Sequence, residues 1–83
     1  MNNAEKLDSA MRLALGLADD IELEGIAYGG TDGWDSVGHM ELVVGIEAAF
    51  GITIDADDVL EMSDYAAVRR VLKDRYAIEL GDR

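Results

Sequence analysis

Apolar residues along the chain recur at intervals of three and four, the spacing of a helix that buries one face. In the first such stretch the apolar face consists of Leu7, Met11, Ala14, Leu15 and Ala18. Asn2 and Glu5 precede it at the spacing of a capping box, in which each side chain bonds the backbone N–H of the other residue. The pattern predicts a first helix that begins after Asn2 and ends near Leu17 or Ala18.

A long loop is expected to separate this helix from the second one. Residues 19–33 contain glycines that interrupt helices, and so long a loop in a small domain is either pinned to the body or functional. The residues expected to pin it are Ile21, Leu23, Ile26, Tyr28 and Trp34. The second helix is predicted to begin at Asp35 or Ser36 and to end at Gly51, because glycine suits the left-handed position after a helix. Its inward stripe is expected to consist of Met40, Val43, Ile46 and Phe50.

Two further helices are predicted after a short extended link at residues 52–54. Asp55, together with Asp58, is expected to cap a short third helix from Ala56 to about Met62, and Ser63 to cap the fourth. The apolar side of the fourth helix consists of Tyr65, Val68, Val71, Leu72 and Tyr76. The predicted fold is all-α: a small four-helix bundle with three longer helices, one short helix and a long loop between helices 1 and 2. It forms one domain over residues 1–83, with a core at about 3–76 and a frayed tail at 77–83.

Composition narrows the classes of function. The 83 residues hold 18 acidic and 7 basic side chains, a net charge of −11, which repels nucleic acids and anionic membranes and attracts basic protein surfaces. No cysteine is present, no stretch is long enough to insert in a membrane, and the N-terminus lacks the pattern of a signal peptide, so we expect a cytoplasmic protein. Residues 55–60 lack the central glycine of a calcium loop and residues 29–33 lack the lysine of a phosphate loop, so we expect no metal site.

Ser36 is the most informative residue because it stands at the mouth of the second helix. The unpaired N–H groups and positive dipole end of a first helical turn favour an attached phosphate. A hydrolase built from Asp35, Ser36 and His39 fails on geometry, because adjacent Asp and Ser cannot both address one imidazole in triad order and nothing builds an oxyanion hole. We therefore expect Ser36 to be modified, and we expect no catalytic residue and no enzymatic activity.

The run from Asp35 to Ile52 resembles the acyl carrier protein family of stand-alone, phosphopantetheine-binding domains. The residues that carry the resemblance are Asp35-Ser36 with the apolar Val37, Glu41-Leu42, Glu47, Phe50-Gly51-Ile52 and Asp55-Ala56-Asp57-Asp58. The resemblance implies that a phosphopantetheinyl transferase attaches 4′-phosphopantetheine from coenzyme A to Ser36. The thiol of this arm would carry acyl intermediates as thioesters. Asp35 would support the site, either by capping the helix or by helping a partner's Mg²⁺ to approach.

The resemblance also implies that basic surfaces of a loading ligase, synthase or acyltransferase dock on the second helix. Glu41 and Glu47 match the acidic positions of the family. His39, one turn after Ser36, is expected to be an exposed neighbour of the prosthetic group. The full set of expected partner contacts is Val37, His39, Met40, Glu41, Val44, Glu47, Asp57, Asp58 and Glu61. The competing interpretations are a solvated face for the acids and core filling for the two valines.

Several alternatives stay open. Gly38, His39, Ala48 and Ala49 stand where many fatty-acid carriers have acidic or polar residues, which favours a specialised fatty-acyl, polyketide or secondary-metabolite pathway. Gly38 and Gly45 indicate either close helix packing, which we favour, or a looser helix that admits an acyl chain into the bundle. The other functions are an aminoacyl or peptidyl carrier, or an unmodified acidic adaptor for a basic protein. We expect a monomer.

Overall fold

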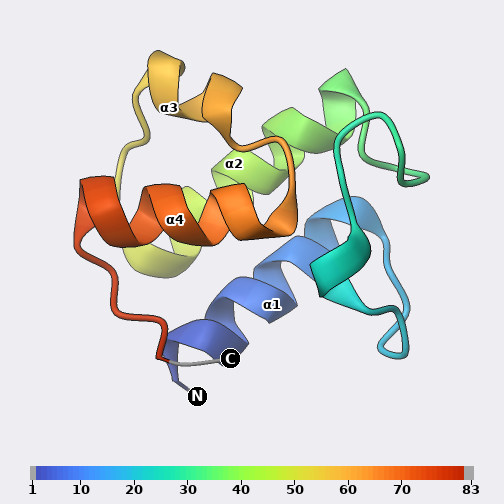
Figure 1. The fold of residues 1–83 in the computed structure, drawn as a ribbon, viewed down its shortest axis with the longest axis horizontal. Coiled ribbons are helices and arrows are strands. Elements are labelled where there is room, and N and C mark those ends of the chain that lie inside the picture. The colour runs from blue at the N-terminus through green and yellow to red at the C-terminus, as the bar shows by residue number, and fades with distance from the viewer. Residues whose placement is uncertain (1, 82–83) are drawn as a thin grey trace.

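The computed structural model describes residues 2–81. Over this range the chain forms four α-helices and one 3₁₀ turn and contains no strand, so the predicted all-α fold is confirmed. The elements are α1 (Asn3–Leu15), η1 (Leu23–Gly25), α2 (Ser36–Phe50), α3 (Ala56–Glu61) and α4 (Tyr65–Tyr76). Figure 1 shows α4 crossing in front of α2, with the short α3 at one end of the molecule and the two ends of the described chain, residues 2 and 81, together at the other.

The start of α1 agrees with the prediction and its end does not. The N–H of Glu5 donates to Asn2 Oδ1 at 2.8 Å and the N–H of Asn2 donates to Glu5 Oε1 at 3.2 Å, which completes the capping box. The helix ends at Leu15, earlier than expected, because Gly16 adopts φ 66° and turns its N–H to the carbonyl of Arg12. A glycine takes this left-handed conformation at little cost.

Both predicted ends of α2 are confirmed, but its inward face is only partly so. Val43 and Ile46 are buried, whereas Met40 is 54% exposed and is not part of the core. Leu42, outside the predicted stripe, is completely buried. Because α2 carries apolar residues on more than one face, periodicity alone could not identify the buried one.

The caps of the last two helices differ from the prediction. Asp55 occupies the position before α3, but its side chain makes no capping hydrogen bond there. Asp64, not Ser63, caps α4 by accepting the N–H of Ala67 at 2.7 Å. Ser63 lies in the connection instead, where its carbonyl accepts the N–H of Tyr28 at 2.8 Å.

The loop between α1 and α2 is pinned at three of the five predicted positions. Leu23, Ile26 and Trp34 are buried, while Ile21 and Tyr28 are exposed. The bond between Tyr28 and Ser63 joins the loop to the start of α4 by backbone atoms, so Tyr28 contributes its N–H rather than a buried ring.

The prediction of a frayed tail is wrong for residues 77–81, and residues 82–83 lie outside the described part. Ile78 and Leu80 are buried in the core. The N–H of Ile78 bonds the carbonyl of Leu72 at 3.1 Å, and the amide of Asn3 donates to the carbonyl of Glu79 at 3.0 Å. The core therefore continues past α4 and reaches back to the start of α1.

Candidate functional site

Ser36 is the first residue of α2, and its side chain is exposed. The carboxylate of Asp35 accepts the N–H of Gly38 at 2.9 Å, so Asp35 acts as the helix cap. The carbonyl of Asp35 accepts the N–H of His39 at 2.8 Å and begins the helical ladder. The hydroxyl of Ser36 is thus exposed to solvent at the N-terminus of α2, which these hydrogen bonds hold in place.

Two glycines allow the chain to pack closely behind this serine. A Cβ at Gly38 would collide with the carbonyl oxygen of Gly33. Gly33 itself has φ 90°, and a Cβ there would lie 2.6 Å from the carbonyl oxygen of Leu15. The end of α1, the end of the loop and the first turn of α2 are therefore stacked backbone against backbone, which supports close packing at Gly38.

Gly45 is different. Outside the backbone of α2, the atom nearest to an added Cβ would be the carbonyl oxygen of Ala10 at 3.9 Å, which is an ordinary van der Waals contact. The predicted close packing therefore holds for Gly38 and not for Gly45.

His39 joins the loop, α2 and α3. The indole N–H of Trp34 donates to His39 Nδ1 at 2.9 Å, so Nδ1 is the unprotonated nitrogen and Nε2 carries the hydrogen that bonds the carbonyl of Val59 at 2.8 Å. Tyr28 packs edge-on against the imidazole, with ring centroids 5.4 Å apart. The expectation that His39 is exposed is wrong, because His39 is partly buried and both its nitrogens are engaged within the protein.

The acidic residues predicted to meet a partner fall into two groups. Glu41 and Asp57 are exposed and available. Glu47 is half-buried and its carboxylate accepts the N–H of Ile54 at 2.8 Å, so it holds the link after α2. Asp58 is only 4% exposed and cannot serve as a docking residue, which corrects the prediction.

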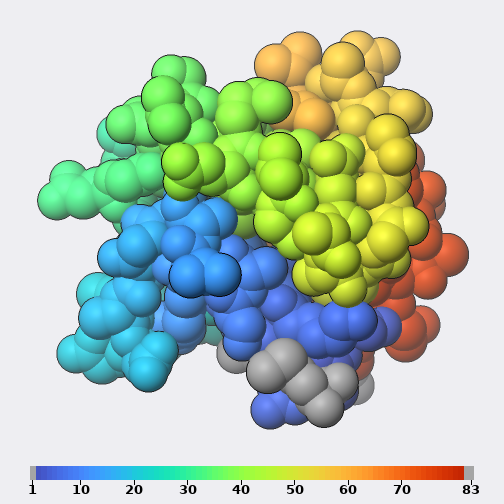
Figure 2. Space-filling view, turned by 180° about the vertical axis from the view of Figure 1, so that it is seen from behind, coloured from blue at the N-terminus to red at the C-terminus, as the bar shows by residue number. Residues whose placement is uncertain are grey.

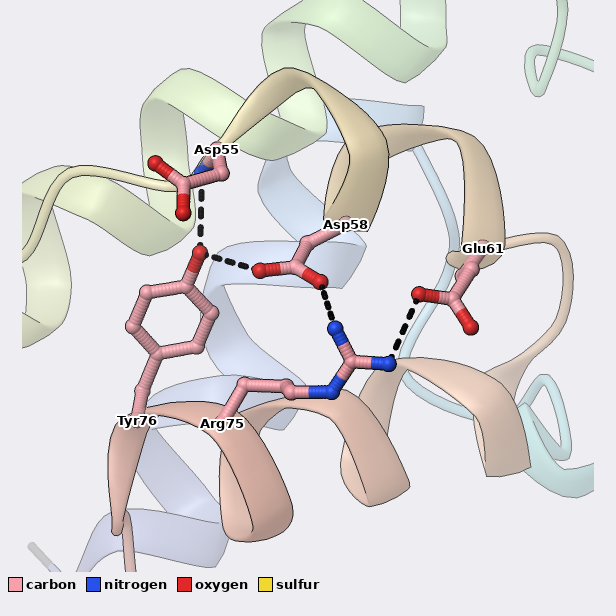
Figure 3. A network of polar contacts seen from close by, with 5 residues as sticks. All are labelled: Asp55, Asp58, Glu61, Arg75 and Tyr76. Carbon is pink, nitrogen blue, oxygen red and sulfur yellow. Dashed lines mark hydrogen bonds and ion pairs between the residues drawn. The ribbon is translucent and has the colours of Figure 1, made fainter.

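Asp58 instead belongs to a polar network that fixes α3 to α4 (Figure 3). Its carboxylate accepts a hydrogen bond from Arg75 at 2.7 Å and another from the hydroxyl of Tyr76 at 2.6 Å. Arg75 also bonds Glu61 at 3.2 Å, and the hydroxyl of Tyr76 accepts the N–H of Asp55 at 2.8 Å. The pKa of Tyr76 is raised, chiefly by the hydrogen bond to Asp58 and secondly by desolvation of the hydroxyl. Because the partners lie on separate helices, no local spacing in the sequence indicated this network.

α1 and α2 lie side by side on the face shown in Figure 2. Exposed apolar side chains project from both helices. Val37, Met40 and Val44 are all more than half exposed, so the two valines do not fill the core. Leu13, 86% exposed, adds to this face and was missed by the sequence reasoning, as was the exposed Leu60 on α3. A groove of about 860 Å³ runs between the two helices, and Leu13, Met40, Val44, Gly45 and Ala48 are among its lining residues.

Residues 2–81 contain no group of three or more His, Asp or Glu side chains placed to hold a metal ion. None of the helices over the same residues combines the length and the hydropathy that crossing a bilayer requires. No protein-family model, curated protein or solved structure matches this chain.

Proposed function

We propose that this protein is an acyl carrier: Ser36 carries a 4′-phosphopantetheine arm, and the thiol of that arm holds acyl groups as thioesters for partner enzymes. The proposal rests on the resemblance of residues 35–58 to the acyl carrier protein family. The observation that supports it best is the exposed hydroxyl of Ser36 on a capped helix start. In the attachment step the Ser36 oxygen forms a bond to the phosphorus of the phosphopantetheine group. The pyrophosphate bond of coenzyme A breaks, the nucleotide leaves, and a base of the transferase takes the serine proton.

The surroundings of Ser36 suit a modified residue better than a nucleophile. His39 is the chain's single histidine, and both its ring nitrogens are occupied by Trp34 and Val59, so it is not free to act as a base. The first helical turn offers N–H groups and a positive dipole end that offset the charge of a phosphodiester. We therefore assign the chemistry to the partners and the presentation of the cargo to this protein.

Partner enzymes would be recognised by charge and by exposed apolar side chains. Glu41, Asp57 and Glu61 are exposed acids, and the whole chain carries a net charge of −11. Val37 on α2 and Leu60 on α3 are exposed and offer apolar contacts. A basic docking surface on a transferase, ligase, synthase or acyltransferase complements this arrangement, and binding should weaken as salt rises.

The test is the intact mass of the protein after incubation with a broad-specificity phosphopantetheinyl transferase and coenzyme A. Wild type should gain the mass of one phosphopantetheinyl group, and Ser36→Ala should gain nothing while keeping its helical circular dichroism. Ser63→Ala is the matched control, because Ser63 is also exposed and lies two residues before the start of α4. An unchanged mass for wild type would refute the proposal and favour an acidic adaptor that binds without being modified.

A further inference from the structure

The basic side chains of this acidic protein are concentrated on α4. Of the seven Lys and Arg residues in the chain, four lie on this helix, together with only one of the 18 acidic residues. The helix therefore carries a net charge of +3, whereas the rest of the chain carries −14. Lys73 and Arg75 lie in the last turn, where the helix dipole favours a cation, but the dipole does not account for Arg69 and Arg70 nearer the middle.

Two of these four cations have no acidic partner in the part of the chain that the structure describes. Arg75 is already neutralised, because it is bonded to Asp58 and Glu61. Arg70 and Lys73 are exposed, and neither forms an ion pair with a described residue. They lie three apart on a helix, so their side chains are neighbours on its surface. Their charges are therefore available to an external anion.

A hollow of about 230 Å³ lies beside these two cations, between α4 and the residues that follow it. Its lining residues are Arg69, Arg70, Lys73, Glu79, Leu80 and Gly81. The guanidinium of Arg69 donates to the carbonyl of Gly81 at 3.2 Å and lies over the ring of Tyr65, 5.7 Å from its centre, so this cation is held in place. The hollow thus has three cationic side chains against the single carboxylate of Glu79.

The hollow lies away from the start of α2. Residue 81 ends the described chain, and the carbonyl of Glu79 accepts the amide of Asn3 at 3.0 Å, which places this segment beside the beginning of α1. Figure 1 shows these chain ends at a distance from the start of α2, where Ser36 stands. A molecule bound in the hollow would therefore leave Ser36 open to a second protein.

Charge complementarity selects the kind of occupant. Nucleic acids and anionic membranes present long arrays of negative charge, which the −14 carried outside α4 repels. A second copy of this chain would bring a further net charge of −11. A short acidic segment of another protein brings only a few carboxylates, and a guanidinium group bonds carboxylates with two parallel hydrogen bonds.

We infer that the hollow between α4 and residues 79–81 binds an acidic segment of a partner protein. Arg70 and Lys73 bond carboxylates of that segment, and Arg69 adds a third positive charge beside them. This surface is separate from the exposed acids of α2, and binding there does not require an arm on Ser36. A partner held at α4 would anchor the protein while other proteins reach the start of α2.

The first experiment titrates the untagged, ¹⁵N-labelled protein with hexaglutamate, acetylated and amidated at its ends, and follows the amide signals by NMR at low salt. Signals of residues 69–73 and 79–81 should shift and reach saturation, and the affinity should fall as salt is raised because the contacts are exposed ion pairs. Signals of residues 35–38 should stay in place. Shifts at the start of α2, or no shifts on α4, would overturn the inference.

Two double variants separate the hollow from the net charge of the protein. Arg70→Gln with Lys73→Gln should weaken the binding of hexaglutamate by about fivefold, the effect of losing two exposed ion pairs. Lys6→Gln with Arg12→Gln removes the same two kinds of cation from α1 and should weaken binding by less than about twofold. Circular dichroism checks that both variants are folded. Equal weakening by the two variants would overturn the inference in favour of a net-charge effect.

Other sources of negative charge provide the last comparison. Inorganic phosphate and vesicles of phosphatidylcholine with phosphatidylserine are tested at the same concentration of negative charge as hexaglutamate, and uncharged hexaglutamine serves as the blank. None of the three should reproduce the shifts on α4. An equal effect of phosphate would identify a simple anion site, and binding to the vesicles would identify a lipid surface. Either result would overturn the assignment to a protein partner.

Discussion

Replacing Gly38 or Gly45 by alanine should change the stability of the protein in opposite directions, although both residues lie in α2. Replacing a helical glycine by alanine gains about 1 kcal/mol of helix propensity wherever the methyl group fits. At Gly45 it fits, because the nearest atom outside the backbone of α2, the carbonyl oxygen of Ala10, lies 3.9 Å from the new Cβ. At Gly38 it does not fit, because the new Cβ would overlap the carbonyl oxygen of Gly33.

The size of the destabilisation at Gly38 depends on which atom must move to make room for the new methyl group. Overpacking a well-packed site costs about 1–3 kcal/mol. The atom in the way at Gly38 is a backbone oxygen, which cannot swing aside as the end of a flexible side chain can, so we expect the upper part of that range. After subtraction of the propensity gain, Gly38→Ala should destabilise the protein by about 1–2 kcal/mol. Gly45→Ala should stabilise it by about 0.5–1 kcal/mol.

Thermal unfolding followed by circular dichroism, together with urea unfolding, measures both changes. For a domain of this size each 1 kcal/mol corresponds to roughly 4–8 °C in Tm, so the two variants should lie on opposite sides of wild type. Each variant serves as the control for the other, because the helix and the chemical change are the same. A Gly38→Ala variant at least as stable as wild type would refute the close packing behind Ser36.

Three further predictions concern the polar contacts that hold α3. Asp58→Asn should lower the free energy of unfolding in urea by about 1–3 kcal/mol. This is less than the loss expected for a fully buried ion pair, because the Arg75 side chain is 52% exposed to water. An unchanged urea midpoint would contradict the network. Because folding raises the pKa of Tyr76, its neutral hydroxyl stabilises the fold fully at pH values below the unfolded pKa of about 10, and this contribution is lost as the pH rises through the pKa of the folded state. Tyrosinate absorbance and circular dichroism should report that loss in wild type but not in Tyr76→Phe. A ¹⁵N NMR spectrum of His39 at neutral pH should show the hydrogen on Nε2, and a hydrogen on Nδ1 would rule out the bond from Trp34.

The sequence predicted the parts of the fold that local chemistry determines. The capping box of Asn2 and Glu5, the cap at Asp35 and the left-handed Gly51 involve neighbours within a few residues, so their spacing identifies them. The earlier end of α1 also had a local signal in Gly16, but the apolar residues after it suggested a longer helix. The exposure of Ser36 followed from its place at a helix start.

Long-range contacts account for most of what the sequence did not show. The assignment of Asp58 to a docking surface and the expected exposure of His39 failed because their partners, Arg75 and Val59, are distant in sequence and could be identified only in the folded chain. The burial of Ile78 likewise depends on how residues after α4 return to the core. The sequence alone does not distinguish an exposed acidic residue from one that is buried against a basic partner on another helix.

The hydrogen bond between Asn3 and the carbonyl of Glu79 has a practical consequence. It holds the two ends of the described chain together, at the end of the molecule away from the start of α2 (Figure 1). A solid support or a fusion partner attached through either end would leave Ser36 facing the solution. The same two ends could be joined by a short linker into a closed ring with a small loss of chain entropy.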